Sequence, residues 1–266
     1  MVNYERGVEK VLTDERHDYI MTKLSKVQTI TVQELVEELG HSESTIRRDL
    51  TQLEVENQLV RIHGGAKRLR KTVTEDSMEE KAIKNSQEKQ RLAKYAAALV
   101  ENKELIYLDA GTTTYEMIPF LQGKDITVVT NGMPHAVSLS EHAISTILVG
   151  GVIKQHTKAI IGSIAENQLE RFHFSKVFLG MNGVDATYGL TTTDIEEASV
   201  KAKAISQANR SYVLADRSKL KEVSFIKVAD IDDCILITES LSKETEEIRE
   251  ITRVLEVSTH DLHSHT

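Results

Sequence analysis

Residues 42–53, with the sequence SESTIRRDLTQL, constrain the fold most, because they show the pattern of an amphipathic helix. Ile46, Leu50 and Leu53 recur at i, i+4 and i+7 and therefore share one apolar stripe. Short hydroxyl side chains followed by two arginines favour a helix that enters a DNA major groove, although an ordinary surface helix would show the same stripe. The candidate DNA contacts of this helix are Ser42, Ser44, Thr45, Arg47, Arg48 and Gln52.

The segment before this helix predicts a second helix, joined to it by a short turn. Thr31 and Glu34 have the spacing of a capping box, in which each side chain satisfies a free backbone N–H group of the other residue. Gly40 is suited to end this helix, since glycine tolerates a positive φ. Ser42 is suited to cap the next helix at once. Two capped helices joined this closely predict a helix-turn-helix.

Residues 58–67 predict a small basic hairpin, or wing, directly after the second helix. Leu59 and Ile62 are apolar positions of a strand, and Gly64-Gly65 is a signal for a tight turn. Cations on such a wing can reach phosphates or the adjacent minor groove. The candidate contacts of the wing are Arg61, His63 and Lys67. A helix-turn-helix with a wing predicts DNA binding more specifically than the helix alone.

The distribution of charge agrees with a DNA-binding head on an acidic body. The chain has 266 residues, with 33 Lys and Arg against 41 Asp and Glu, and a net charge of −8. Residues 1–71 contain 12 basic and 12 acidic side chains, so the whole acidic excess lies in residues 72–266. Residues 61–71 contain five basic side chains and no acidic one. This asymmetry favours nucleic acid as a partner, and a solvated surface loop is the alternative.

The sequence predicts a cytoplasmic protein without a membrane span. Its one cysteine, Cys234, excludes an intrachain disulfide and suits a reducing compartment. The chain has no apolar stretch of about 18 residues and no apolar signal segment at its N-terminus. His260, His263 and His265 could together bind a metal, but we interpret them as a polar tail. We predict no metal site and no cofactor.

From residue 104 onwards, short apolar runs alternate with helical patterns. The predicted strands are residues 105–108, 126–129, 146–149, 176–179, 212–215 and 234–237. The predicted helices are residues 115–121, 164–170, 195–209 and 243–254, preceded by a helix over residues 79–101. The alternation predicts an α/β fold with a mostly parallel sheet covered on both faces. We therefore expect residues 1–71 to form a winged helix-turn-helix DNA-binding domain, residues 72–101 a linker and connecting helix, and residues 102–266 an α/β effector-binding domain.

Polar groups follow the predicted strands, at the edge of the sheet where α/β proteins bind ligands. Asp109-Ala-Gly-Thr-Thr-Thr114 follows the first strand and opens a helix, where glycine lets a ligand approach and the helix N-terminus favours an anion. This loop is not a Walker loop, because G-x-x-x-x-G-K-[ST] is absent. The candidate effector-binding residues at the strand ends are Asp109, Gly111, Thr112, Thr113, Thr114, Asn131, Gly150, Gly151, Asn182, Gly183, Asp216 and Lys219.

Three further charged residues complete the candidate effector site: Lys158, Glu197 and Lys201. Glu197 and Lys201 stand at i, i+4 on a predicted helix. They could form a surface ion pair that contributes about 0.3 kcal/mol to stability. Alternatively, both point into the pocket and hold sugar hydroxyls or a phosphate.

The ordered set of motifs resembles the DeoR family of bacterial transcriptional regulators. The resemblance extends from about residue 12 to about residue 257. The similar segments are Glu15-Arg16, Thr45-Ile-Arg-Arg-Asp-Leu50, Arg61-Ile-His-Gly-Gly-Ala66, Leu108-Asp-Ala-Gly-Thr-Thr-Thr114, Thr130-Asn131, Asn182-Gly-Val-Asp185, Glu197-Ala-Ser-Val-Lys201 and Asp216-Arg-Ser-Lys219. The resemblance implies a winged helix-turn-helix followed by a mostly parallel α/β sugar-phosphate-sensing domain similar to ribose-phosphate isomerase.

The same resemblance implies a repressor of a sugar utilisation operon that binds double-stranded operator DNA, in the bacterial nucleoid, as a homodimer or homotetramer. Ser42-Glu-Ser-Thr45, Glu116-Met-Ile-Pro-Phe-Leu121 and Thr130-Asn-Gly-Met-Pro-His135 are similar to repressors of fructose operons, which implies fructose 1-phosphate as the effector. Two alternatives stay open at this point. One is an isomerase-like enzyme with an accessory head, and the other is an interaction module whose head binds protein.

Overall fold

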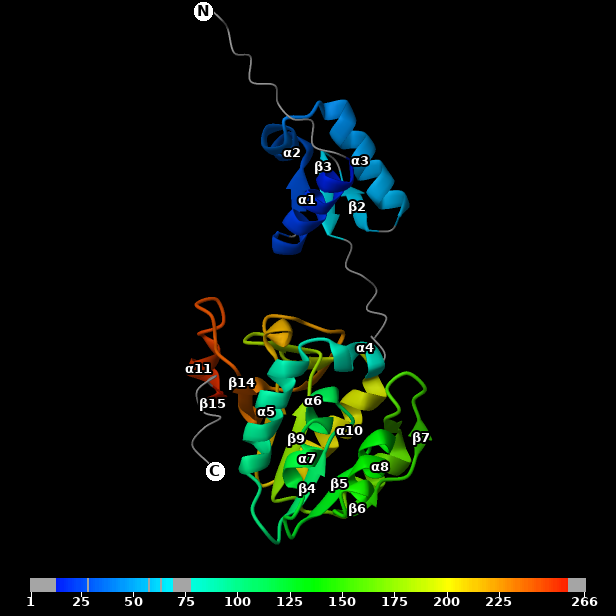
Figure 1. The fold of residues 1–266 in the computed structure, drawn as a ribbon, viewed down its shortest axis with the longest axis vertical. Coiled ribbons are helices and arrows are strands. Elements are labelled where there is room, and N and C mark those ends of the chain that lie inside the picture. The colour runs from blue at the N-terminus through cyan, green and yellow to red at the C-terminus, as the bar shows by residue number, and fades with distance from the viewer. Residues whose placement is uncertain (1–12, 28, 57, 63, 69–77, 258–266) are drawn as a thin grey trace, which may run out of the picture. The chain divides into compact units, whose positions relative to one another are not determined.

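The computed structural model describes residues 13–27, 29–56, 58–62, 64–68 and 78–257 (Figure 1). By its internal contacts the chain divides into two compact units, Met1–Thr74 and Glu75–Thr266. Each unit has a hydrophobic core of its own. Among the described residues, no helix has both the length and the apolar composition needed to cross a membrane.

The first unit is a winged helix-turn-helix. Its helices are α1 (Thr13–Lys26), α2 (Val32–Leu39) and α3 (Glu43–Val55), and its strands are β1 (Thr29–Thr31), β2 (Leu59–Ile62) and β3 (Gly65–Arg68). The strands form an antiparallel sheet in the order β1-β3-β2. Ile46, Leu50 and Leu53 of α3 are fully buried, as their spacing predicts, and pack in one cluster with Ile20 and Leu24 of α1. The third strand, β1, was not predicted.

The helix ends of this unit follow from the side chains that the sequence supplies. The Thr31 hydroxyl accepts from the backbone N–H of Glu34, and the Glu34 carboxylate accepts from the backbone N–H of Thr31. Gly40 ends α2 in the left-handed conformation, with φ of 64°. Ser42 caps α3 by accepting from the backbone N–H of Thr45. The predicted capping box and both predicted caps are therefore confirmed.

The second unit is built on a seven-stranded sheet in the order β15-β14-β12-β9-β4-β5-β6. All neighbouring strands of this sheet run parallel. Its strands are β4 (Leu105–Leu108), β5 (Thr127–Thr130), β6 (Ser145–Leu148), β9 (Lys176–Gly180), β12 (Ser211–Leu214), β14 (Ile235–Thr238) and β15 (Val254–Glu256). The predicted parallel α/β architecture is confirmed, and each predicted strand lies within one residue of its observed position.

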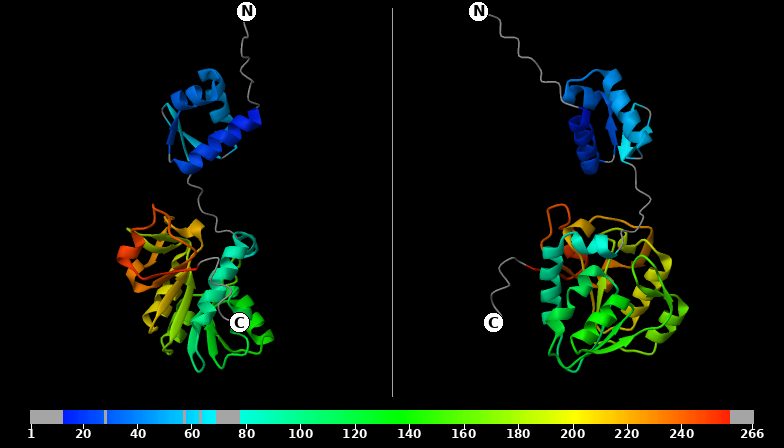
Figure 2. Two further views of the ribbon diagram at one scale, coloured as in Figure 1. Left: turned by 60° about the vertical axis from the view of Figure 1, so that its left-hand side comes forward. Right: turned by 45° about the vertical axis from the view of Figure 1, so that its right-hand side comes forward.

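Helices cover both faces of this sheet (Figures 1 and 2). Ile106 and Leu108 of β4 pack in one cluster with α5 (Ser86–Ala98) and α7 (Ile118–Leu121), whereas Tyr107 packs in the other with α9 (Ser163–Leu169) and α10 (Ile195–Ser206). Successive side chains of a strand point to opposite faces, which explains this division. The remaining helices are α4 (Met78–Ile83), α6 (Thr112–Tyr115), α8 (Met133–Glu141), α11 (Ile248–Ile251) and the 3₁₀ turns η1 (Arg217–Lys219) and η2 (Ile231–Asp233).

Two smaller sheets lie beside the main one. They contain β7 (Val152–Ile153) with β8 (Ile160–Ile161), and β10 (Gly183–Asp185), β11 (Gly189–Thr192) and β13 (Ile226–Ala229) in that order. All of their paired strands run antiparallel. The predictions contained neither of these sheets.

Three predicted helices differ from the observed ones. The helix over residues 79–101 is interrupted before Asn85, which adopts a left-handed φ of 55° that asparagine tolerates better than most residues. The helix over residues 115–121 is instead two short helices, α6 and α7, and Pro119 stands in the first turn of α7, where its missing N–H costs nothing. Residues 243–254 are helical only over α11, and Val254 begins β15.

Candidate nucleic-acid interface and ligand pocket

The outward face of α3 carries the polar side chains predicted to contact DNA. Ser42, Ser44, Arg47, Arg48 and Gln52 are exposed, and Thr45 is half-buried. On the wing, Lys67 is exposed and Arg61 is half-buried, whereas His63 lies outside the described residues. Because the apolar stripe of α3 is fully buried, the helix can present only this polar face to a partner.

The arginines of this face differ in their partners. Arg47 forms an i, i+4 ion pair with Glu43. Within the described part of the chain, Arg48 has no hydrogen-bond or ion-pair partner. Arg61 donates to the Thr51 hydroxyl at 2.8 Å and to the backbone carbonyl of Arg47 at 3.4 Å. Arg61 therefore ties the wing to α3, whereas Arg48 keeps its full donor capacity for a partner.

A buried ion pair fixes α3 against α1. The Arg16 guanidinium donates to both carboxylate oxygens of Asp49, at 2.8 and 2.9 Å, and both residues are less than 10% exposed. The hydrogen bond to Asp49 raises the pKa of Arg16 above its ordinary value. A bidentate geometry of this kind holds both side chains in one orientation. It therefore sets the angle at which α3 is presented.

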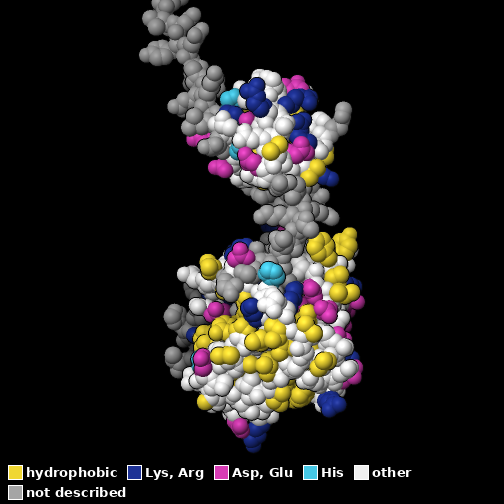
Figure 3. All heavy atoms as spheres, turned by 90° about the vertical axis from the view of Figure 1, so that its right-hand side faces the viewer, with side chains coloured by type: hydrophobic (Ala, Val, Ile, Leu, Met, Phe, Trp, Pro, Cys, Tyr) yellow, Lys and Arg dark blue, Asp and Glu magenta, His cyan; other side chains and the backbone are white. Residues whose placement is uncertain are grey.

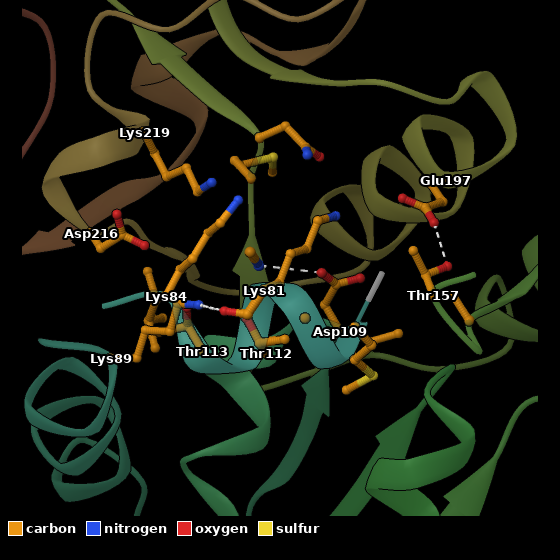
Figure 4. Close-up of a pocket in the computed structure, with 18 of the residues that line it drawn as sticks. Lys81, Lys84, Lys89, Asp109, Thr112, Thr113, Thr157, Glu197, Asp216 and Lys219 are labelled. Carbon is orange, nitrogen blue, oxygen red and sulfur yellow. Dashed lines mark hydrogen bonds between the residues drawn. The ribbon is translucent and has the colours of Figure 1, made fainter. Parts of the chain in front are cut away.

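The second unit contains a cavity of about 210 Å³ at the carboxyl ends of its central strands. Asp109 and Gly111 follow β4, Asn131 follows β5, Asn182 follows β9 and Asp216 follows β12. The structure brings together ten of the predicted effector-binding residues in its lining. These are Asp109, Gly111, Thr112, Thr113, Asn131, Asn182, Glu197, Lys201, Asp216 and Lys219. We call this cavity the sheet-end pocket (Figure 4).

Asp109 and Lys201 form an ion pair in the lining of this pocket. Lys201 contacts the Asp109 carboxylate and also donates to the backbone carbonyl of Gly180 at 3.0 Å. The same carboxylate accepts from the backbone N–H of Gly180 at 3.2 Å. A Cβ on Gly111 would lie 3.5 Å from the Gly180 Cα atom. Gly111 and Gly180 therefore lie close together in the lining of the pocket, where the ends of β4 and β9 meet.

Glu197 is held on another side of the pocket. Its carboxylate accepts from Lys154 at 3.0 Å and from the Thr157 hydroxyl at 2.8 Å. Glu197 and Lys201 are each only 7% exposed. The two residues therefore do not form the surface ion pair that was one of the two predictions. Lys201 pairs with Asp109 instead. Both side chains line the pocket, as the alternative prediction requires.

Three lysines that we did not predict reach the pocket from the start of the second unit. Lys81 belongs to α4, Lys84 follows it and Lys89 belongs to α5. Lys89 donates to the Thr112 hydroxyl at 3.1 Å, and burial lowers its pKa below the ordinary value. Figure 4 shows Lys84 and Lys219 extending into the same part of the pocket from different segments. These lysines precede the sheet in the chain and belong to two helices separated by a break, so no pattern at the strand ends marks them in the sequence.

Asn85 joins this segment to the strand ends. Its side-chain amide donates to the Asp216 carboxylate at 3.0 Å. That carboxylate also accepts from the backbone N–H of Ser218 at 2.9 Å and so begins the turn η1. Lys219 is carried by the same turn. The break between α4 and α5 is therefore fixed to the turn that presents Lys219.

Five predicted effector-binding residues lie outside the pocket lining: Thr114, Gly150, Gly151, Lys158 and Gly183. The Thr114 hydroxyl donates to the backbone carbonyl of Asp109 at 2.6 Å. Gly150 donates from its N–H to the side chain of Gln168. A Cβ on Gly151 or Gly183 would come within 3.0 Å of a backbone carbonyl oxygen. Thr114, Gly150, Gly151 and Gly183 therefore serve the local packing of turns and strands.

The charge of the pocket lining is opposite in sign to that of the whole chain. The lining contains five lysines and three carboxylates, which gives a net charge of +2, whereas the chain carries −8. An anionic ligand with polar substituents would satisfy both kinds of side chain.

His135 lies directly behind the pocket and is completely buried. Its Nε2 atom is 3.1 Å from the backbone carbonyl oxygen of Gly111 and 3.3 Å from the Thr114 hydroxyl. Burial lowers the pKa of His135 to about 4. The ring is therefore neutral at pH 7, and the proton on Nε2 can be donated to Gly111.

Models of known protein families match both units. The model of the DeoR-like helix-turn-helix domain matches residues 16–72. The model of the DeoR C terminal sensor domain matches residues 84–240, more than half of the chain.

Individual proteins match over most of the chain. The HTH-type transcriptional regulator FruR of Bacillus subtilis is 47% identical over 86% of this chain and 91% of its own length. The lactose phosphotransferase system repressor of Streptococcus mutans is 37% identical over 80% of this chain and 86% of its own. Among solved structures, ribose 5-phosphate isomerase A of Methanocaldococcus jannaschii matches with 20% identity and a TM-score of 0.39, over 51% of this chain and 55% of its own.

These matches decide between the open alternatives, because both domain models and the similar proteins belong to regulators of transcription. They assign the chain to regulators of transcription and not to isomerase-like enzymes. The chain belongs to the DeoR family and is a transcriptional regulator with a DNA-binding helix-turn-helix unit and a C-terminal sensor domain.

Proposed function

We propose that this regulator represses a sugar utilisation operon, and that a phosphorylated sugar in the sheet-end pocket controls its affinity for operator DNA. The observation that carries the proposal is the lining of the pocket. Five lysines and three carboxylates surround one cavity of about 210 Å³ in an otherwise acidic protein. A sugar phosphate combines the anionic group and the hydroxyl groups that such a lining would bind.

We assign DNA recognition to the outward face of α3 and to the wing. Thr45, Arg48 and Gln52 lie on the exposed side of α3 and are suited to the edges of bases in the major groove. Ser42, Ser44, Arg47 and Lys67 are suited to phosphates. Arg61 supports this face from behind, because it donates to α3.

We assign the phosphate of the effector to the lysine-rich side of the pocket. Lys81, Lys84 and Lys219 approach this side from two segments that are far apart in the chain. Glu197 and Asn182 lie elsewhere in the lining and are suited to sugar hydroxyls.

The position of α4 supports a route from the effector to the head. α4 is the first described element of the sensor domain, and two of the pocket lysines, Lys81 and Lys84, belong to it or follow it directly. A ligand held by these lysines would fix the C-terminal end of α4, and the chain leads back to the head from the other end of this short helix, at Met78, which also lines the pocket. The effector can change DNA affinity only by as much as it prefers one arrangement of this segment over another.

Fructose 1-phosphate is the effector that we propose first. The similarity of residues 42–45, 116–121 and 130–135 to repressors of fructose operons supports it. We further propose that residues 1–71 bind DNA, that residues 72–101 connect the domains, and that the protein acts in the cytoplasm as a homodimer or homotetramer, because half-sites in operators mirror protein symmetry.

Fluorescence anisotropy on the upstream region of the protein's own gene would test the proposal. The complex is titrated at fixed salt with fructose 1-phosphate, fructose 6-phosphate, tagatose 6-phosphate and free fructose. We expect one phosphate to change the DNA affinity and free fructose to leave it unchanged. Tight DNA binding that no phosphate alters would contradict the sensor assignment, and absence of DNA binding would contradict the assignment of the head.

A pair of neighbouring lysines provides a matched control. Lys219 lines the pocket, whereas Lys221 does not and pairs instead with Glu244 on the surface. Lys219→Ala should leave DNA binding intact and remove the response to the effector. Lys221→Ala should respond like the wild type.

A further inference from the structure

One edge of the sensor domain is almost free of charge. Residues 126–153 contain a single charged side chain, Glu141, although 28% of the whole chain is charged. The segment forms β5, α8, β6 and β7 at one end of the seven-stranded sheet. A solvated surface of this length normally carries several charges, so the composition indicates a surface that is covered.

Large apolar side chains are exposed along this same segment. The exposed residues are Met133, Val137, Ile147, Leu148, Val152 and Ile153, which are between 37% and 61% accessible. Figure 3 views this side of the molecule and shows a broad band of hydrophobic side chains, with charged ones mainly at its margins. Proteins that remain monomeric rarely expose a continuous apolar surface of more than a few hundred Å².

The backbone of this edge is also unprotected. β6 is the last strand of its sheet, and within the described residues it pairs only with β5. Its sequence, Ser145-Thr-Ile-Leu148, contains no charge and no proline. Proteins normally protect an exposed edge strand with such residues, because its free N–H and C=O groups can pair with another strand.

A second copy of this chain fits these observations better than a partner of different chemistry. Residues 72–266 carry the whole acidic excess of the chain, but residues 126–153 contribute only one carboxylate to it. A basic partner would therefore bind elsewhere on this domain. Two copies of such an acidic domain repel each other, and they approach most easily through the face that lacks charge. Two copies related by a two-fold axis also bring β6 against its own antiparallel copy, where donors and acceptors match.

We propose that the free edge of β6, with the exposed apolar side chains of α8 and β7, is the surface through which two copies of this regulator associate about a two-fold axis. The inference extends the proposed function, because it states which surface makes the dimer. We call this surface the β6 edge. It is distinct from the sheet-end pocket, since none of its six exposed apolar residues lines that pocket.

Measurement of the mass in solution tests this proposal without DNA or effector, so its failure is distinguishable from failure of the proposed function. The full chain is analysed by sedimentation equilibrium, and a dimer has twice the chain mass of 29.8 kDa. Val137→Asp and Val152→Asp each place a carboxylate in the β6 edge. Val137 is 60% exposed and Val152 is 61% exposed, so neither substitution disturbs the core. Phe225→Asp is the matched control, because Phe225 is 63% exposed and lies just before β13.

We expect both β6-edge variants to weaken self-association about 100-fold or more, since each dimer would bury two unpaired carboxylates. Phe225→Asp should associate like the wild type, and circular dichroism and thermal unfolding should show all variants folded. If the wild type is a tetramer, the proposal requires that both variants form a smaller assembly, such as a dimer. A wild-type protein that is monomeric at every attainable concentration would overturn the proposal. Unchanged association of both variants would also overturn it.

Discussion

Arg48 and Arg61 show how two arginines of one DNA-binding unit can have different tasks. Arg48 has no partner among the described residues, whereas Arg61 donates to Thr51 and to the backbone of α3. The guanidinium group of Arg48 is therefore available for a base edge. That of Arg61 is already engaged in holding the wing.

Arg48→Ala should weaken specific DNA binding by about 1–3 kcal/mol and relax the preference for one base position. Anisotropy titrations on the operator and on single-base variants of it measure both effects. A uniform loss on every sequence would instead identify Arg48 as a phosphate contact. Arg61→Ala should lower the thermal stability of the head as well as its affinity, which separates support from direct contact.

His135 should make the stability of the sensor domain depend on pH. Burial lowers its pKa from 6.5 in the unfolded chain to about 4, so the folded state disfavours the charged ring. The stabilisation is fully present above about pH 6.5 and is lost as the pH falls towards 4. For a completely buried group this loss amounts to about 3 kcal/mol.

Urea unfolding between pH 7 and pH 4 tests this with the wild type and His135→Asn. Carboxylates that titrate in this range affect both proteins, so the difference between them isolates His135. The free energy of unfolding of the wild type should fall more steeply than that of the variant. Parallel curves would contradict a neutral buried ring.

At the scale of elements, α3 depends on α1 through the ion pair between Arg16 and Asp49. Asp49→Ala leaves the Arg16 guanidinium buried without its partner and should lower the free energy of unfolding of the head by about 3 kcal/mol or more. Glu43→Ala removes only the exposed pair with Arg47 and should change it by less than about 1 kcal/mol. Chemical denaturation of the two variants compares them directly. Equal effects would show that the buried pair has no special role.

The elements that the sequence predicted correctly are those whose signals are local. The strands of the main sheet appear as short apolar runs, and the caps Thr31, Gly40 and Ser42 are recognisable from their own neighbours. The helix break at Asn85 was missed, because a left-handed residue leaves no trace in hydrophobic periodicity. Strands as short as β7 and β8 depend on pairing between distant residues, which a single sequence does not reveal.

The residues of the pocket also divide into those with a local signal in the sequence and those without one. The residues after β4, β5, β9 and β12 were predictable, because parallel strands bring their carboxyl ends to one edge. Lys81 and Lys84 were not predictable as pocket residues, since they precede the sheet in the chain and reach the pocket only through long-range packing. Gly151 and Gly183 were predicted at the site because loop glycines look alike in sequence, whether they serve a ligand or a close backbone contact.

At the scale of the whole molecule, the division into two units predicts that an effector stabilises only one of them. At about 100 times its dissociation constant, a ligand bound in the pocket should stabilise the sensor domain by about 2.7 kcal/mol. Differential scanning calorimetry should then show the sensor transition moving upwards while the head transition stays in place. Lys81→Ala should reduce this shift, because Lys81 lines the pocket. Movement of both transitions by the same amount would indicate that the units unfold together.

The excess of lysine in the sheet-end pocket has a consequence for any laboratory that handles this protein. Five lysines against three carboxylates give the lining a net charge of +2. Inorganic phosphate and sulfate are small enough to enter and carry the charge that the lining attracts. In such buffers the effector must displace an ion that is already bound, and its apparent dissociation constant rises in proportion to the buffer concentration. A titration in phosphate buffer would thus measure an exchange of anions and underestimate how tightly the pocket holds its own ligand.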